Sequence, residues 1–313
     1  MSEDMYYEIF DDLIGKHLRD SLVYRYDPQK NNHEYTPFRH HYDSKTEKII
    51  GEFMRKYIFM YAYSESEVIK ANKKGRLSDL EEAAKFALEE RLPKRKGASN
   101  GLYSELLLDL LITLYTNDVN KLATRAIYRQ LSDNQEIKGY DGLHISVDSQ
   151  NNKNLWLGQA KMGERSYCVS DIKRDLNGKA NMLYTAEQLF FLADKEEKTL
   201  PKAIDLLEKI NDVNWDNRTL PKDERAERLS ELFEKENVKI FFICLLAYGR
   251  PNVYEIENEI DNEIEKEIKS IQSTYDKEFQ GLISNDYEVL LWIIPIRDLQ
   301  LLRESMGILN GTN

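Results

Sequence analysis

Residues 141–161 constrain the fold more than any other part of the chain, because they predict two strands joined by a polar turn. Their sequence is DGLHISVDSQNNKNLWLGQAK, in which the polar cluster DSQNNKN supplies the turn. Side chains alternate between the two faces of a sheet along a strand. A turn centred near Asn151 would set Asp141 opposite Lys161. We therefore expect one sheet face that is apolar near the turn and carries Asp141, Gln159 and Lys161 at its other end.

The segment before this hairpin predicts a buried helix. Residues 101–116 have the sequence GLYSELLLDLLITLYT, which is apolar almost all round. Glu105 and Asp109 are one helical turn apart, so their carboxylates share a face. If the helix packs on the hairpin, Glu105 comes close to Asp141. We expect Asp109 to support the site or to lie on the helix surface, with metal ligation as the alternative.

Together these residue types predict a metal-dependent hydrolytic site. Glu105 and Asp141 offer carboxylate oxygens, and Gln159 offers an amide oxygen. With the backbone carbonyl of Ala160 they form a set of hard ligands that suits Mg²⁺, for which Mn²⁺ can substitute. Lys161 would orient or deprotonate the attacking water and stabilise the charged transition state. The alternative is a surface salt bridge between Asp141 and Lys161.

The pattern along the whole chain predicts an α/β fold. Residues 1–96 are expected to form a mainly helical N-terminal region, and residues 97–313 a second domain. Short segments rich in β-branched and aromatic residues, separated by polar turns, predict strands. They lie at residues 127–131, 137–147, 155–162, 241–248 and 287–296. We therefore expect a mixed sheet of about five strands flanked by helices.

The charge of the chain limits its partners. It carries 44 Lys and Arg against 55 Asp and Glu, a net charge of −11. Basic patches supply most of the non-specific affinity for DNA, so this balance argues against a nucleic-acid binder that works alone. Two short basic strips are candidate nucleic-acid contacts, with a merely solvated surface as the alternative. They are Lys94, Arg95 and Lys96, and Lys173 with Arg174.

The most acidic segment, residues 252–277, predicts a helix. Ile256, Ile260, Ile264, Ile268 and Ile271 form one stripe at helical spacing, and acidic residues crowd the other faces. We expect the stripe to pack on the core and the acidic face to be solvated. Repulsion of DNA, or docking on a basic partner, is the alternative role of that face.

Nothing in the pattern predicts export or membrane insertion. The longest apolar runs, at residues 241–247 and 289–296, are far shorter than the roughly 20 residues that span a bilayer. The N-terminal stretch MSEDMYYEIF is acidic, unlike a signal peptide. The two cysteines, Cys168 and Cys244, lack the spacing of metal ligands. We expect a cytoplasmic protein.

A glutamate in a helix, an aspartate in a strand and Gln-x-Lys in the paired strand resemble the PD-(D/E)xK nuclease superfamily. The strings SELLLDLL, KGYDGLHI and LWLGQAK, followed by a helix, resemble the HamA family more closely. HamA is the nuclease subunit of Hachiman anti-phage defence systems. The motif region covers about 60 residues, and the helical N-terminal part is also compatible with that family.

This resemblance implies a restriction-endonuclease-like core in residues 97–313 and Mg²⁺-dependent cleavage of DNA. The implied catalytic residues are Glu105, Asp141, Gln159 and Lys161, the first three as metal ligands. The resemblance also implies control by a partner helicase, HamB, of the superfamily 2 type. Position 159 holds Gln where many members of the superfamily have Glu, as in the Mrr-like branch and related Cap4-type sites. The alternative function is a catalytically silent subunit with a nuclease fold that binds and regulates a helicase.

Overall fold

A computed structural model describes residues 4–21, 23–25, 35–92, 101–116, 119–124, 139–147, 150, 152–193, 201–279 and 287–307. Seven strands of this described part form one sheet, in the order β1-β2-β7-β6-β5-β4-β3. They are β1 (Val23–Arg25), β2 (Tyr35–His40), β3 (Val119–Thr124), β4 (Gly142–Val147), β5 (Lys153–Gly163), β6 (Val238–Gly249) and β7 (Tyr287–Ile296). β2, β7, β6 and β5 are parallel, whereas β4, β3 and β1 pair antiparallel with their neighbours. The α/β class is confirmed.

The sheet has more strands than the five that the sequence predicts. β1, β2 and β3 are additional, and the strand expected at residues 127–131 lies outside the described residues. These additional strands are short: β2 pairs with β7 over only Tyr35 to Pro37, and β3 has a register shift between Lys121 and Ala123. Strands of this kind leave little periodic signal in the sequence, because their stability comes from the strand beside them.

The described helices enclose the sheet on both faces. They are α1 (Asp4–Phe10), α2 (Lys16–Ser21), α3 (Thr46–Ala62), α4 (Glu65–Lys73), α5 (Leu80–Glu90), α6 (Leu102–Tyr115), α7 (Arg165–Lys179), α8 (Met182–Ala193), α9 (Pro201–Asp216), α10 (Lys222–Lys235), α11 (Ile260–Phe279) and α12 (Leu299–Met306). A π-helix, η1 (Asp11–Gly15), and two 3-10 turns, η2 (Pro251–Tyr254) and η3 (Glu257–Glu259), complete the set. None of the described helices combines the length and the apolar character needed to cross a membrane.

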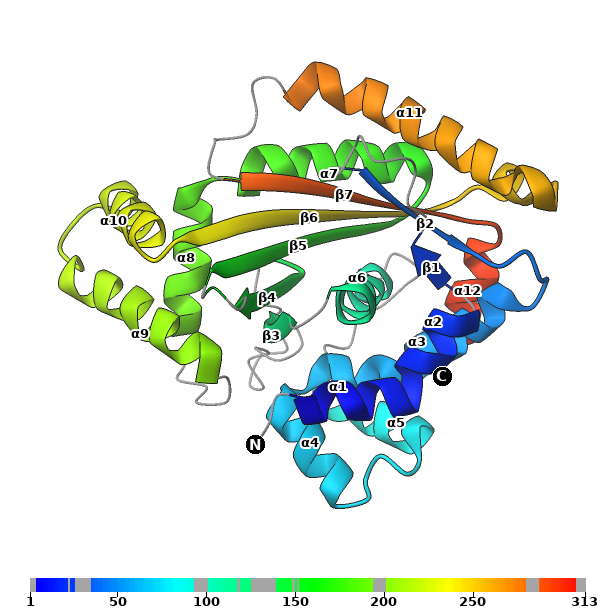
Figure 1. Cartoon of the computed structure of the whole chain (residues 1–313), viewed down its shortest axis with the longest axis horizontal. Helices are drawn as coiled ribbons and strands as arrows, with labels where there is room; N and C mark the ends of the chain where they lie inside the picture. Colours follow the sequence, from blue (N-terminus) through cyan, green and yellow to red (C-terminus); the bar gives the residue numbers. More distant parts are fainter. Residues whose placement is uncertain are drawn as a thin grey trace.

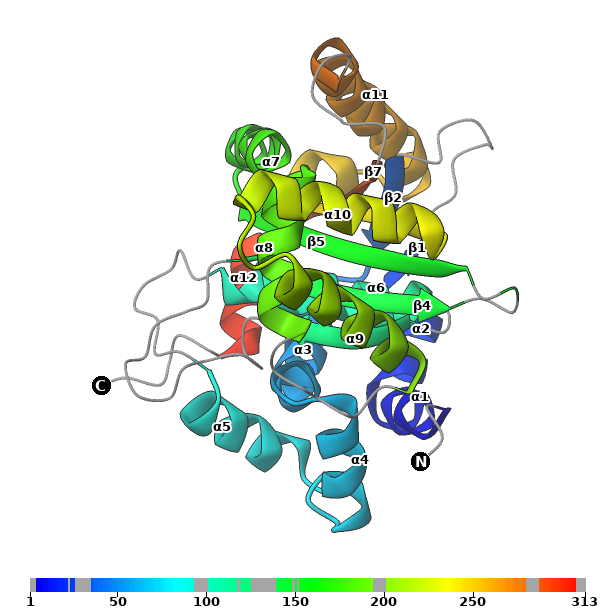
Figure 2. The same ribbon diagram turned by 90° about the vertical axis from the view of Figure 1, so that its left-hand side faces the viewer.

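Two hydrophobic cores lie on opposite faces of the sheet (Figures 1 and 2). One contains the side chains of α1, α3, α4, α5, α6 and α12 with Ala160 and Met162 of β5. The other contains α7, α8, α9, α10 and α11 with Leu155 and Leu157 of the same strand. Even and odd positions of β5 thus face different helices, as the alternation of side chains requires.

The N-terminal region is mainly helical, as expected, and it adds to the same sheet and core as the rest of the chain. β2 pairs with β7. The core around α3 includes side chains from both sides of residue 96, such as Met54 and Leu107. The division of the chain at residue 96 stays a prediction.

Two helices that the sequence predicts have clear outcomes. α6 is buried almost throughout. In α11, Ile260, Ile264, Ile268 and Ile271 are buried. The sequence predicts Ile256 in the same stripe, but its side chain is 54% exposed, because the α-helix begins only at Ile260, after two 3-10 turns.

Candidate active site

At Ala160, the backbone N–H and carbonyl of β5 bind side chains instead of a neighbouring strand on the β4 side. Among the described residues, β4 accompanies β5 only as far as Gly158, which pairs with Gly142. Beyond that pair, the backbone N–H of Ala160 donates to Oδ2 of Asp141 over 2.7 Å. The carbonyl of Ala160 accepts a hydrogen bond of 3.3 Å from the hydroxyl of Ser104, in the first turn of α6. Asp141 and the start of α6 therefore meet at one point on the sheet edge.

A glycine allows α6 to come this close to the sheet. A Cβ atom at Gly158 would lie 2.6 Å from Cδ2 of Leu108, which is too close for real atoms. Without that side chain, α6 packs directly on β5. This packing carries Ser104 to the carbonyl of Ala160.

The register of the hairpin differs from the expected one. Leu143 pairs with Leu157 and Val147 with Lys153, so the turn is centred on residue 150 and Asp141 does not lie opposite Lys161. The prediction is wrong by two residues along β5. An even displacement preserves the faces, so the apolar side chains of both strands still share one core, as expected.

Lys153, which the sequence assigns to the polar turn, is the first residue of β5 and pairs with Val147. Its ammonium is buried and lies 2.7 Å from the carboxylate of Glu236, at the C-terminal end of α10. This ion pair stabilises a lysine inside the strand, and β5 begins earlier than its composition indicates.

On the face covered by α7, β5 presents Gln159 and Lys161 to charged groups of that helix. Nζ of Lys161 lies 2.6 Å from Oδ2 of Asp175. Nζ of Lys179 lies 3.2 Å from Oδ1 of the same carboxylate and donates a hydrogen bond of 2.5 Å to Oε1 of Gln159. Asp175 therefore bridges two lysines, and the amide oxygen of Gln159 is engaged by one of them.

The electrostatics of this cluster also involve Asp141. Burial lowers the pKa of Lys161, but the charge of Asp141 and the contact with Asp175 outweigh burial and hold it above its usual value. For Lys179, burial is the larger effect and the pKa falls, despite attraction to the same two carboxylates. Burial raises the pKa of Asp175, yet the two lysines hold it below its usual range. Asp141, Gln159 and Lys161 are thus brought into one polar cluster.

A comparison with known families identifies the family of this chain. The family model HamA matches residues 14–307, which is nearly the whole chain. The chain belongs to the HamA family. The match supports a role as a component of a Hachiman defence system. No curated protein sequence matches the chain.

In this HamA-family chain, Glu105 lies on the other side of the sheet from Gln159 and Lys161. It lies on α6, whose core includes Ala160 and Met162, whereas Gln159 and Lys161 face α7. Glu105 is 2% exposed, and its Oε2 accepts a hydrogen bond of 2.9 Å from the hydroxyl of Tyr61. Its neighbour along the chain contacts Ala160. The convergence of Glu105 with the other three residues stays a prediction.

Asp109 belongs to a buried network rather than to the edge of β5. Its Oδ1 lies 2.9 Å from Nε2 of His144, and its Oδ2 lies 2.7 Å from Nζ of Lys121 and accepts a hydrogen bond of 2.6 Å from Tyr57. Burial raises the pKa of Asp109, but Lys121 and His144 hold it below its usual value. These contacts favour a supporting role for Asp109 over metal ligation. Tyr57 and Tyr61 of α3 hold Asp109 and Glu105 of α6 on one face, as the helical spacing predicts.

The candidate nucleic-acid contacts fall in two places. Lys94, Arg95 and Lys96 lie outside the described residues. Lys173 and Arg174 lie on α7, and the guanidinium of Arg174 is 2.9 Å from Asp171. Their contact with DNA stays a prediction.

Asp175 and Lys179 are the members of the cluster that the sequence analysis missed. A signal was present, because Asp171, Asp175 and Lys179 recur every four residues on one face of the helix that follows Gln-x-Lys. That spacing is equally typical of a solvent-exposed helix. Only the contact with Lys161 distinguishes the two.

Proposed function

We propose that this HamA-family chain is a metal-dependent DNA endonuclease, the effector of a bacterial anti-phage defence system, controlled by a partner helicase. The observation that carries the proposal is the arrangement around Ala160. Asp141 and the first turn of α6 meet at the open edge of β5, and Lys161 follows on the same strand within the electrostatic reach of Asp141.

The proposed ligands are oxygen donors, the kind that a hard cation prefers. Among the described residues, no three His, Cys, Asp or Glu side chains are grouped as a metal site. The carboxylates of Glu105 and Asp141 and the carbonyl of Ala160 are nevertheless oxygen donors, and Mg²⁺ is commonly held by one or two carboxylates while it keeps several waters. Mg²⁺ or Mn²⁺ held there would polarise the phosphate and activate water for attack on phosphorus. Gln159 is the remaining proposed ligand.

Lys161 and Asp141 have different proposed roles in the reaction. With its pKa raised, Lys161 carries a positive charge at neutral pH. It is therefore better suited to stabilise the negative charge that develops on the phosphate than to remove a proton from water. Asp141, fixed by the N–H of Ala160, holds its carboxylate at the edge of the sheet and also helps to keep Lys161 charged.

Cleavage of plasmid DNA tests the proposal. In Mg²⁺ or Mn²⁺, with the partner helicase present, we expect the wild-type chain to cleave. Lys161→Ala and Asp141→Ala should each lower the rate by about 10²- to 10⁴-fold or more without unfolding the protein. Metal removal by EDTA should abolish cleavage.

Lys153→Ala is the matched control, because it removes a buried lysine of the same strand whose partner is Glu236. It should lower the melting temperature while the folded fraction still cleaves. Unfolding of both Lys161→Ala and Asp141→Ala would instead show that these residues form a structural ion pair.

The competing function is a catalytically silent subunit that regulates a helicase. It is favoured by Gln159, which brings no charge and whose amide oxygen is taken by Lys179. In that case the chain would bind the helicase but show no cleavage with either metal, and Lys161→Ala would leave the activity of the complex unchanged.

A further inference from the structure

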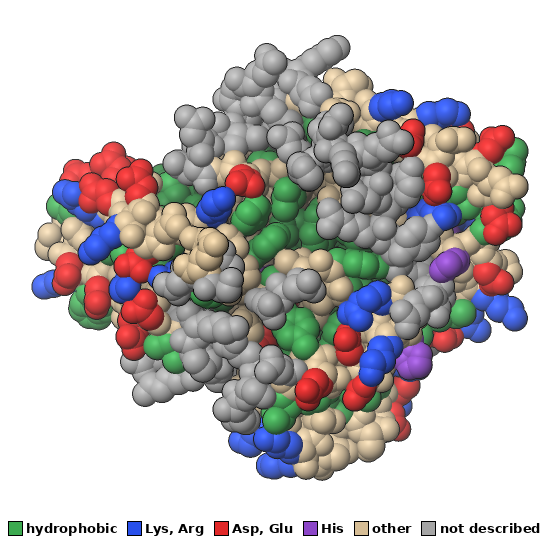
Figure 3. Space-filling model, in the orientation of Figure 1, with side chains coloured by type: hydrophobic (Ala, Val, Ile, Leu, Met, Phe, Trp, Pro, Cys, Tyr) green, Lys and Arg blue, Asp and Glu red, His purple; other side chains and the backbone are tan. Residues whose placement is uncertain are grey.

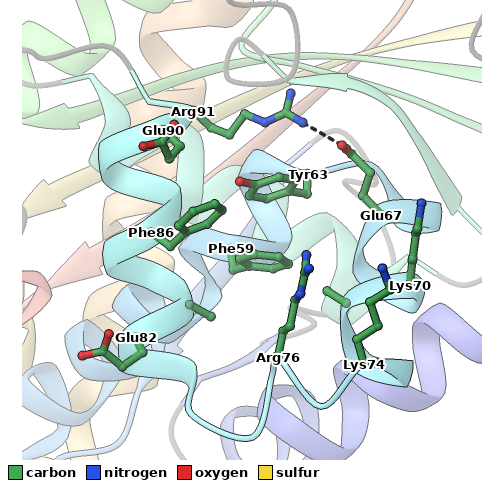
Figure 4. A pocket seen from close by; sticks show the side chains of 12 residues that line it. Phe59, Tyr63, Glu67, Lys70, Lys74, Arg76, Glu82, Phe86, Glu90 and Arg91 are labelled. Atoms are coloured by element: carbon green, nitrogen blue, oxygen red, sulfur yellow. Dashed lines mark hydrogen bonds and ion pairs between the residues drawn. The ribbon is translucent and has the colours of Figure 1, made fainter.

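A groove lies between α4 and α5, over α3 (Figure 4). These helices lie on the side of the molecule away from α7 (Figure 1). Its volume is about 860 Å³. Aromatic side chains form its floor. The rings of Phe59 and Tyr63 stack with centroids 4.3 Å apart and planes 19° apart. Phe86 projects from α5 toward them and remains 54% exposed, which is unusual for so large an apolar side chain.

The aromatic floor is held in place at one end. The guanidinium of Arg91 lies 4.6 Å from the centre of the Tyr63 ring and 2.7 Å from the carboxylate of Glu67 on α4. Glu67 also caps the start of α4 through Ser64. These contacts fix the Tyr63 ring. The charges of Arg91 and Glu67 neutralise each other.

The wall of the groove formed by α4 and the turn after it is basic. It carries Lys70, Lys74 and Arg76, and within the described part of the chain none of the three has an ion-pair partner. Figure 3 shows basic side chains gathered at the lower edge of the molecule, over α4. On the α5 side, Glu82 is paired with Lys85 at 3.0 Å, which leaves Glu90 as the opposing acidic group.

A structural explanation accounts for only part of this arrangement. Lys70 lies in the last turn of α4, where a cation offsets the helix dipole. That effect does not explain Arg76, which follows the helix. It also does not explain an exposed Phe86 ring aimed at two stacked rings. Local positive charge stands out further in a chain with a net charge of −11.

We propose that this groove binds single-stranded nucleic acid, with a base stacked on the exposed ring of Phe86, above the buried rings of Phe59 and Tyr63, and phosphates held by Lys70, Lys74 and Arg76. An exposed ring that accepts base stacking, beside a strip of cations that follows the nucleic-acid backbone, is the combination by which proteins hold single strands without reading their sequence. A duplex keeps its bases stacked inside and cannot offer them to the ring. The proposal goes beyond the proposed function, because it stands whether or not the chain cleaves DNA.

Fluorescence anisotropy with a labelled oligothymidylate of about ten nucleotides tests the groove. The full chain is used in EDTA, so that no cleavage intervenes. Phe86→Ala should weaken binding about tenfold, since stacking on one ring is worth about 1–3 kcal/mol and about 1.4 kcal/mol is tenfold. If about three phosphates are neutralised, a plot of the logarithm of the affinity against the logarithm of the salt concentration should have a slope of about −2. Lys74→Glu should weaken binding and flatten this slope.

Two variants elsewhere on the surface serve as matched controls. Trp215→Ala removes an aromatic side chain of α9 that is 57% exposed, and Lys235→Glu makes the same charge reversal on α10. Both should bind as the wild type does.

Failure of the oligothymidylate to bind, or equal weakening by the control variants, would overturn the proposal. A polyglutamate peptide tests the alternative occupant, an acidic protein segment. If that peptide displaces the oligonucleotide and binds the wild type and Phe86→Ala alike, the groove accepts an acidic protein segment and the assignment to nucleic acid is wrong.

Discussion

Two lysines in the candidate site have pKa values shifted in opposite directions. Lys161 is held above its usual value by Asp141 and Asp175, and Lys179 is lowered by burial. Groups whose environments separate their pKa values in this way commonly divide the acid and base tasks of a site. Lys161 is suited to remain a fixed positive charge, and Lys179 is the group that gives up a proton more readily. The motif in the sequence indicates only the first of them.

Gln159→Glu tests whether the uncharged residue weakens the site. The side chain is fully buried, and Nζ of Lys179 lies 2.5 Å from its amide oxygen, so a carboxylate of the same size has a cation beside it. We expect the variant to fold, to keep or raise cleavage, and to bind Mg²⁺ more tightly, because a charge is restored to a hard-cation site. Isothermal titration with Mg²⁺ measures the change, with Gln300→Glu on the exposed face of α12 as the control. Weaker Mg²⁺ binding by a folded Gln159→Glu protein would contradict this.

His40 gives a prediction for the pH dependence of stability. Burial lowers its pKa to about 4, against the attraction of Glu47. Its Nδ1 donates to the carbonyl of His41, and its Nε2 accepts from the backbone N–H of Arg297, so the ring is neutral in the fold. The unfolded chain binds the proton more readily. The free energy of unfolding should therefore be unaffected by His40 above about pH 6.5 and should fall as the pH drops toward about 4.

Urea denaturation of the wild type and His40→Gln over that range isolates the effect of His40. The variant loses hydrogen bonds and should be less stable at neutral pH, but its stability should fall less steeply on acidification. Parallel pH profiles for the two proteins would show that His40 does not titrate as its burial implies.

At the scale of elements, the sequence predicts those helices and strands whose hydrophobic residues recur at a clear period. It places α6 almost to the residue, the two faces of the hairpin, and the long strands β6 and β7, whose apolar runs are buried on both faces. The prediction fails where contacts with residues distant in the sequence determine the bounds or the pairing of a strand. Lys153 lies in β5 with Glu236 as its ion-pair partner, and β2 pairs with the distant β7 and with β1.

In the candidate site, too, local sequence predicts some residues and long-range packing determines the others. Asp141, Gln159 and Lys161 could be predicted because they lie on one hairpin. Asp175 and Lys179 could not, because their part in the cluster depends on how α7 packs back on β5. The direction from which α6 presents Glu105 also depends on packing, through the close approach at Gly158.

The network between α6, β3 and β4 should make a large contribution to stability. Asp109, Lys121 and His144 are each at most 4% exposed. Lys121→Met leaves the Asp109 carboxylate buried without its ammonium, and such a change costs about 3–5 kcal/mol. The double variant Lys121→Met/Asp109→Leu should recover part of that loss, because the unpaired charge is gone. Urea denaturation measures both, and a double variant less stable than Lys121→Met would contradict the argument.

At the scale of the whole molecule, the distribution of charge bears on how DNA reaches the site. The acidic helix α11 lies beside α7, the helix that contacts Lys161 (Figure 1). Glu267 of α11 turns inward to Arg165 and Arg250, whereas Glu257 and Glu259 just before the helix are exposed. Acidic and basic side chains are interspersed over α9 and α10 (Figure 3). The field of the molecule therefore does not steer a polyanion toward the candidate site.

We expect the isolated chain to bind duplex DNA poorly and to form a stable complex with a helicase partner. With a net charge of −11, only short basic strips oppose the overall field, and neutralising a few phosphates gives weak binding that is steeply dependent on salt. A helicase bound to the same duplex would raise the effective concentration of DNA at the site. Gel-shift titration near physiological salt, with and without the helicase, measures both effects. Nanomolar binding by the chain alone, with no gain from the helicase, would show that local contacts overcome the overall charge and that the protein reaches DNA unaided.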